Sequence, residues 1–167
     1  MTGPALECLY EGMDALGLTD PEARQRVAAY LALLQRWNGA YNLTGTREAG
    51  ALVRRHLLDC LAIAGHVDRG PVLDLGAGAG LPGLLLAIVR PALAFTLLDA
   101  NAKKARFLNQ ARLELALTNV EVVRARAEAL ERPGAFALAT ARAVAGPAGV
   151  HAMTAPLLAD GGEVLVM

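Results

Sequence analysis

Apolar residues recur at intervals typical of helices over the first third of the chain. A first helix is expected to stop at Gly17, and its apolar residues are Leu6, Leu9, Met13 and Leu16. A second helix opens where Thr19 and Glu22 are spaced as a capping box. It is expected to end before Gly39, and its apolar face is Ala23, Val27, Tyr30, Leu31, Leu34 and Trp37. A third helix is expected over residues 48–66, so that residues 1–66 form an N-terminal helical cap.

From Val72 the pattern changes to short apolar runs that alternate with helical segments. Strands are expected to open at Val72 and to cover residues 93–99, 120–123, 136–141 and 163–167. Helices are expected from Pro82, over residues 102–117 and over residues 146–158. Strands that alternate with helices predict an α/β fold with a parallel sheet and helices on both faces. Residues 67–167 are therefore expected to form a Rossmann-like core in the same domain as the cap.

The stretch Val72–Gly83 joins an apolar run to closely spaced glycines and a proline. Glycines adopt positive φ angles and allow a ligand to approach bare backbone, and proline is favoured in the first turn of a helix. The unit therefore predicts a strand, a ligand-binding loop and a helix whose N-terminal end faces the ligand. Residues 78–83 fit G-x-G-x-x-G, but Asp74 disfavours a pyrophosphate beside it. A cationic ligand such as S-adenosylmethionine is favoured instead, and Asp74 is expected to help hold it.

Ligands of open parallel sheets bind at the carboxyl ends of the strands. Asp99 ends the second strand, where a carboxylate accepts hydrogen bonds from ribose hydroxyls, although it also suits a cap for the next helix. Ala127 and Glu128 follow the third strand, where a backbone N–H and a carboxylate suit an adenine edge; Glu128 equally suits a helix start. Arg142 follows the fourth strand, in a segment with no candidate general base. A methyl-acceptor atom that carries no proton, such as N7 of guanine, is consistent with the lack of a base in this segment.

The charges sum to zero, with 16 basic and 16 acidic residues, but they are unevenly distributed. All charged residues among positions 1–22 are acidic, whereas basic residues cluster after Asp99 and at Arg54–Arg55. This distribution suits an RNA-binding surface on one face, although charge alone favours an ordinary solvated helix face. The candidate RNA-binding residues are Arg55, Lys103, Lys104 and Arg106.

The composition, with 54% hydrophobic and 19% charged residues, is typical of a globular protein. No apolar run is long enough to span a membrane, and the acidic N-terminus is unlike a targeting peptide. The two cysteines, Cys8 and Cys60, suit a reducing cytoplasm and give no metal-ligand spacing, so no metal is expected. His56 and Asp59 lie three residues apart and suit either a catalytic pair or a packing hydrogen bond.

Five motifs together resemble the RsmG (GidB) family of bacterial methyltransferases. They are Tyr41–Thr44, Arg55–Asp59, Asp74–Gly83, Leu98–Asp99 with Lys103–Lys104 and Phe107–Leu108, and Ala141–Ala143. The resemblance implies a class I S-adenosylmethionine-dependent fold and transfer of a methyl group to N7 of guanine 527 in 16S ribosomal RNA. It implies cofactor contacts at Gly76, Leu81, Ala127, Glu128 and Arg142, beside the contacts expected at Gly78 and Asp99.

The family continues past Met167 with a turn and two further strands, so the C-terminal strands of the sheet are expected to be missing here. Two alternatives stay open. One is an NAD(P)-dependent oxidoreductase, which shares the glycine loop and Asp99 with a methyltransferase. The other is a non-catalytic RNA-binding remnant of the methyltransferase fold. The substrate is expected to be 16S ribosomal RNA or a small-subunit particle.

Overall fold

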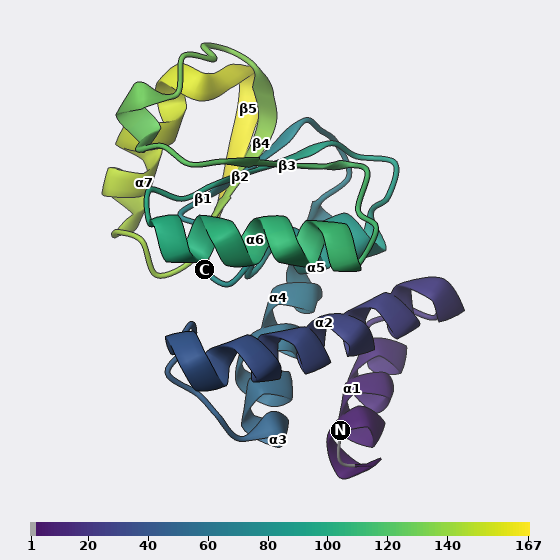
Figure 1. The fold of residues 1–167 in the computed structure, drawn as a ribbon. Helices are drawn as coiled ribbons and strands as arrows, with labels where there is room; N and C mark the ends of the chain where they lie inside the picture. The colour runs from purple at the N-terminus through teal and green to yellow at the C-terminus, as the bar shows by residue number, and fades with distance from the viewer. Residues whose placement is uncertain (1–2) are drawn as a thin grey trace.

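The computed structural model describes residues 3–167, in which five strands form one parallel sheet with the order β3-β2-β1-β4-β5 (Figure 1). The strands are β1 (Val72–Leu75), β2 (Phe95–Leu98), β3 (Val120–Val123), β4 (Phe136–Ala141) and β5 (Leu158–Val166). The predicted α/β architecture is confirmed. β5 begins at Leu158 rather than at Glu163, because Leu158 already pairs with Phe136 before an irregularity that contains Gly161 at φ 73°.

The connections between the strands place a topological switch point beside β1. The chain passes from β1 outward to β2 and β3, and it then returns to the other side of β1 to form β4 and β5. The loops that follow β1 and β4 therefore diverge at the carboxyl edge of the sheet. A crevice at this position is where open α/β sheets bind their ligands.

Helices precede the sheet and alternate with its strands. The α-helices are α1 (Gly3–Ala15), α2 (Pro21–Tyr41), α3 (Ala49–Leu52), α4 (Leu58–Ala62), α5 (Gly83–Val89), α6 (Ala102–Glu114) and α7 (Pro147–Thr154). A π-helical turn, η1 (Val53–Leu57), joins α3 to α4, and the 3₁₀ turns are η2 (Ile63–His66), η3 (Ala127–Ala129) and η4 (Ala155–Leu157). The single helix expected over residues 48–66 is thus a helical run whose hydrogen-bond pattern changes along its length.

Two expectations about α2 are wrong. Its N-cap is Asp20 rather than Thr19, because the Asp20 carboxylate accepts a 2.7 Å hydrogen bond from the backbone N–H of Ala23. The helix also continues through Gly39 to Tyr41. A helical glycine costs only about 1 kcal/mol, and the stacked rings of Trp37 and Tyr41, 5.1 Å apart, pack across this last turn.

The two faces of the sheet are covered by different helices (Figure 1). α5 and α6 lie between the sheet and the N-terminal helices, which are residues 3–66. α7 covers the opposite face, where Val150 and Leu157 pack with Leu73, Leu75 and Phe136. Helices therefore lie on both faces, as predicted.

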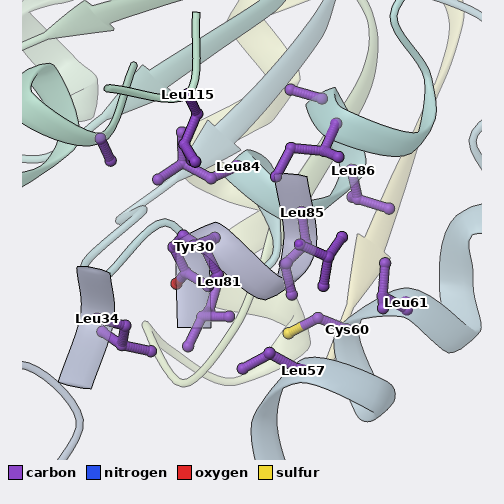
Figure 2. Packing of buried hydrophobic residues seen from close by; sticks show 14 of the residues in the cluster. Tyr30, Leu34, Leu57, Cys60, Leu61, Leu81, Leu84, Leu85, Leu86 and Leu115 are labelled. Carbon is purple, nitrogen blue, oxygen red and sulfur yellow. The ribbon is translucent and has the colours of Figure 1, made fainter. Parts of the chain in front are cut away.

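The N-terminal helices share a hydrophobic core with the helix that follows the glycine loop (Figure 2). Tyr30 of α2 and Leu57 and Cys60 of the η1–α4 run lie beside Leu81 and Leu85, and all five are buried. Buried apolar contact of this kind holds the N-terminal helices in a defined position beside the ligand-binding edge.

Candidate functional site

The loop after β1 has the backbone that its glycines predict. Gly76, Gly78 and Gly80 have φ angles of 67°, 59° and 82°, a region that other residues rarely adopt. A Cβ atom on Gly76 would also lie 2.6 Å from Cγ2 of Val144. The helix begins at Gly83, with Pro82 as its N-cap residue rather than within its first turn. Glycine is thus required here by both conformation and close packing.

Asp74 does not face a ligand, and the expectation that it would hold a cationic cofactor is wrong. The residue is 1% exposed, and it lines neither of the pockets at this edge. One carboxylate oxygen accepts a 2.9 Å hydrogen bond from the N–H of Gly83, and the other accepts one of 2.9 Å from the Thr140 hydroxyl. Burial raises the pKa of Asp74 to about 7, although both hydrogen bonds oppose the rise. Asp74 therefore fixes α5 to β1 and β4.

Asp99 connects the glycine loop to the start of α6. Its Oδ2 accepts a 2.8 Å hydrogen bond from the N–H of Gly78, and its Oδ1 accepts one of 2.8 Å from the N–H of Asn101. Asn101 in turn caps α6 by accepting from the N–H groups of Lys103 and Lys104. Because each carboxylate oxygen has two lone pairs, Asp99 keeps acceptor capacity for a ligand while it shapes the loop.

Two adjoining pockets lie at the carboxyl edge of the sheet. The larger pocket, of about 490 Å³, is lined by Leu43, Thr44, His56, Gly76, Ala77, Gly78, Ala79, Leu81, Asp99, Ala100, Lys104, Arg142, Ala143 and Val144. The smaller pocket, of about 150 Å³, is lined by Leu75, Gly76, Leu98, Asp99, Ala100, Ala125, Arg126, Ala127, Glu128, Val144 and Met153. The walls of both pockets include Gly76, Asp99, Ala100 and Val144.

All seven residues expected to contact the cofactor line one or both of these pockets. Gly78, Leu81 and Arg142 belong to the larger pocket, and Ala127 and Glu128 belong to the smaller one. The two remaining residues, Gly76 and Asp99, lie where the pockets adjoin. Residues from four strand ends, more than sixty positions apart in the sequence, thus surround one crevice.

The side chain of Arg142 reaches from the end of β4 to the N-terminal helices. Its Nη2 donates a 3.1 Å hydrogen bond to the carbonyl of Arg55 and one of 2.7 Å to Nδ1 of His56. Its Nη1 lies 3.5 Å from Sγ of Cys60, and its Nη2 lies 3.9 Å from a carboxylate oxygen of Asp59. The guanidinium therefore ties the wall of the larger pocket to the helical run that contains Arg55 and Asp59.

His56 contacts Arg142 and Thr46 rather than pairing with Asp59 as a catalytic dyad. An arginine only donates, so Nδ1 of His56 accepts and carries no proton. The proton of the neutral ring is then on Nε2, which lies 3.0 Å from the Thr46 hydroxyl and donates to it. Burial and the charge of Arg142 lower the pKa of His56, while Asp59 opposes them. Both ring nitrogens are thus engaged within the protein.

The segment Asn42–Thr46, which overlaps the motif Tyr41–Thr44, contributes Leu43 and Thr44 to the lining of the larger pocket. Asn38, 1% exposed in α2, holds this segment. Its amide donates to the Thr44 hydroxyl and to the Thr46 carbonyl, and its Oδ1 accepts from the Thr44 N–H. The apolar spacing of α2 gives no hint of this role, because Asn38 is polar and acts on residues beyond the helix end.

The four candidate RNA-binding residues differ in their surroundings. Arg55, Lys103 and Arg106 are exposed, whereas Lys104 is half-buried and lines the larger pocket. Its ammonium nitrogen lies 3.9 Å from the position that a Cβ would occupy on Gly78. Lys104 is therefore closer to the predicted cofactor site than its position in a basic cluster suggests.

Residues 3–167 are the part of the chain that the structure describes. They contain no helix long and apolar enough to cross a membrane. They also contain no group of three or more His, Cys, Asp or Glu side chains placed to hold a metal ion.

The order of the strands, the glycine loop at the switch point and the acidic residue that ends β2 form a Rossmann-like fold, which is the fold of class I S-adenosylmethionine-dependent methyltransferases. The same fold occurs in M. jannaschii TYW2, solved in complex with AdoMet, at a TM-score of 0.55 and 15% identity over 64% of this chain and 49% of that one. S-adenosylmethionine, predicted from the sequence, is the cofactor of this class and is confirmed.

The chain belongs to the family of rRNA small subunit methyltransferase G, whose model (GidB) matches residues 23–167. It is 52% identical to ribosomal RNA small subunit methyltransferase G of Chromohalobacter salexigens, over 98% of this chain and 79% of that protein. It is 46% identical to the protein of the same name from Xanthomonas campestris pv. campestris, over 95% of this chain and 74% of that protein. The predicted resemblance is confirmed, and the oxidoreductase alternative is set aside.

Proposed function

We propose that this protein transfers a methyl group from S-adenosylmethionine to N7 of guanine 527 in 16S ribosomal RNA, free or within a small-subunit particle. One observation carries the proposal: the seven residues assigned to the cofactor from the sequence line two adjoining pockets at the switch point of the sheet. Membership of the rRNA small subunit methyltransferase G family supports ribosomal RNA as the substrate.

The two pockets suit the two halves of the cofactor. The adenine ring is assigned to the smaller pocket, where Ala127 and Glu128 offer a backbone N–H and a carboxylate. Asp99, where the pockets adjoin, is assigned to the ribose hydroxyls. The methionine half is assigned to the larger pocket along Gly78, with Lys104 and Arg142 as cationic partners for its carboxylate.

Methyl transfer to N7 needs no general base, because N7 presents a lone pair and carries no proton. When bound, S-adenosylmethionine supplies an electrophilic methyl group on a sulfonium. The protein's contribution is then to hold the acceptor in line with this methyl group, and orientation of this kind lowers a barrier by up to roughly 7–11 kcal/mol. His56, the histidine that lines the larger pocket, has both ring nitrogens engaged by Arg142 and Thr46, which fits a reaction without a base.

The exposed cations Arg55, Lys103 and Arg106 are assigned to RNA phosphates, since they lie on η1 and α6, two elements that each contribute a residue to the lining of the larger pocket. Such contacts position the RNA without reading its sequence. Residues 1–66 and 67–167 are assigned to one methyltransferase domain, the former as its helical cap. The hydrophobic core that α2 and α4 share with α5 supports this assignment.

The test is mass analysis of 16S ribosomal RNA from cells that lack the gene. Wild-type protein is expected to restore a 7-methylguanosine at position 527, and the variant Asp99→Ala is expected to restore far less. Methylation at a different base would show that the site assignment in the RNA is wrong. A particle that binds the protein but gains no methyl group would support the non-catalytic alternative.

Calorimetry with purified protein tests cofactor binding independently of the RNA substrate. S-adenosylhomocysteine is expected to bind, and NADH is expected not to bind. Binding of NADH alone would contradict the proposed function at its first step.

A further inference from the structure

The segment that follows β4 forms a shared wall of both pockets. Ala143 has a φ angle of 53°, and the exposed side chain of Val144 lines the larger and the smaller pocket. Val144 also packs so closely over Gly76 that no Cβ fits there. The position of this segment therefore determines the shape of the crevice where the cofactor halves meet.

Arg142 is the residue that holds this segment on the side of the N-terminal helices. Its hydrogen bonds go to the carbonyl of Arg55 and to Nδ1 of His56, both within the π-helical turn η1. π-helical turns are rare in proteins, but those that do occur are frequently located at functional sites. Here the turn presents a backbone carbonyl and a side-chain acceptor to the same guanidinium nitrogen.

His56 joins two parts of the pocket wall through opposite sides of its ring. Nδ1 accepts from Arg142, while Nε2 contacts the Thr46 hydroxyl in the segment that Asn38 holds. The ring itself lines the larger pocket. Only the neutral tautomer with its proton on Nε2 makes both contacts.

We propose that His56 is a positioning residue whose unprotonated Nδ1 holds Arg142, and with it the Ala143–Val144 wall, in the form that binds the cofactor. The proposal rests on the placement of the cofactor given under the proposed function. It assigns His56 no contact with the reacting atoms and no proton transfer.

Two conservative variants separate the two contacts of the ring. In His56→Asn the side-chain oxygen lies near the place of Nδ1 and still accepts from Arg142. In His56→Gln the amide nitrogen reaches the place of Nε2 and still donates to Thr46, but the acceptor for Arg142 is lost. Calorimetry with S-adenosylhomocysteine is expected to show near wild-type affinity for His56→Asn and about tenfold weaker binding for His56→Gln and His56→Ala. His66→Asn, at an exposed position in η2, is the matched control and is expected to bind normally.

A pH profile adds a readout that a purely structural role would not change. The charged groups around the ring are Arg142, Arg55 and Asp59, and Asp99 and Lys104 share its pocket. Wild-type affinity is expected to fall in acid, as Nδ1 gains a proton and repels Arg142, by more than the affinity of His56→Asn falls over the same range. Thermal unfolding of each variant is measured alongside to register any loss of folding.

Equal affinity of wild type, His56→Gln and His56→Ala would overturn the positioning role and leave the methyltransferase proposal standing. Binding by His56→Asn as weak as that by His56→Gln would also overturn it, because the acceptor would then not matter. Absence of S-adenosylhomocysteine binding by the wild type would overturn the proposed function together with this inference.

Discussion

The hydroxyl of Tyr30 donates a 2.7 Å hydrogen bond to the carbonyl oxygen of Ala79, and it joins the middle of α2 to the glycine loop 49 residues later. Tyr30 is fully buried, and Ala79 lines the larger pocket. Burial raises the pKa of Tyr30 well above its ordinary value, so the hydroxyl keeps its proton as a donor. An N-terminal helix therefore fixes the loop that the cofactor is expected to contact.

Tyr30→Phe is expected to leave the Ala79 carbonyl without its partner and to lower the free energy of unfolding by about 1–3 kcal/mol. A weaker affinity for S-adenosylhomocysteine is expected in the same variant, because the glycine loop loses its hold on α2. Denaturant unfolding and calorimetry check the two effects. Tyr10→Phe, in α1, is the control. Unchanged cofactor affinity in Tyr30→Phe would show that the loop keeps its shape without this bond.

Asp74→Asn tests the buried carboxyl group beneath the loop. The pKa of Asp74 is raised from 3.8 to about 7 by burial, so the folded state binds this proton more strongly than the unfolded state. The stability linked to Asp74 is therefore fully present below pH 3.8 and declines as the pH rises toward 7, by up to about 1.4 kcal/mol per pH unit.

The asparagine variant lacks this ionisation and is expected to gain stability relative to wild type over the same pH range. Denaturant unfolding at a series of pH values measures the difference. Asp160→Asn, at an exposed position in β5, is the control. A difference between Asp74→Asn and wild type that is constant with pH would contradict the raised pKa.

Gly83→Ala places a methyl group against Oδ2 of Asp74 and Cδ2 of Leu97, where no space exists. The expected loss of stability is about 1–3 kcal/mol or a failure to fold, because α5 can no longer approach β1. Gly39→Ala is the matched control in α2, since no atom beyond its chain neighbours and the backbone of its own helix lies within 4 Å of the new methyl group. That variant is expected to gain about 0.5–1 kcal/mol from helix propensity. Similar stability of the two variants in thermal unfolding would contradict the packing argument.

Lys103 and Lys104 are adjacent in the sequence and are expected to act on different ligands. Lys104→Ala is expected to weaken binding of S-adenosylhomocysteine, since its ammonium group lies beside Gly78 in the larger pocket. Lys103→Ala is expected to leave that affinity unchanged, to weaken RNA binding, and to lower its salt dependence by about one unit. Calorimetry and RNA titration over several salt concentrations measure both. Each variant is the control for the other, and equal effects on the cofactor would remove the distinction.

The rate of methyl transfer is expected to be nearly constant across neutral and mildly alkaline pH. No base is needed at N7, and the lowered pKa of His56 keeps its ring neutral throughout that range. Single-turnover rates at saturating RNA and cofactor check this. A rate that rises tenfold per pH unit and loses that dependence in His56→Ala would identify a base and contradict the proposed acceptor atom.

Local signals in the sequence determined the elements and much of the site. Short apolar runs bounded by Gly, Asp and Arg located the strands, because such runs are buried on both faces of a parallel sheet. Asp99 and Glu128 are predicted as cofactor contacts from the rule that ligands bind at strand ends, which depends only on the order of the elements, and both line the pockets at that edge. The C-terminal end of α2 and the start of β5 were predicted wrongly, because tertiary packing and strand pairing outweigh the local effect of glycine.

Only the tertiary structure decided what each polar side chain at this edge contacts. Asp74 accepts hydrogen bonds from Gly83 and Thr140 and does not line the pockets. Lys104 lines the larger pocket, and Arg142 donates a hydrogen bond to a backbone carbonyl of η1. Thr140 and Arg55 lie 66 and 87 residues from their partners Asp74 and Arg142, and no local spacing relates them. The Asp74–Thr140 bond depends on the pairing of β1 with β4, and the bonds of Arg142 depend on how the N-terminal helices pack beside the sheet. That packing is stabilised by burial of apolar area, which is non-directional, so the apolar pattern of the sequence does not specify these contacts.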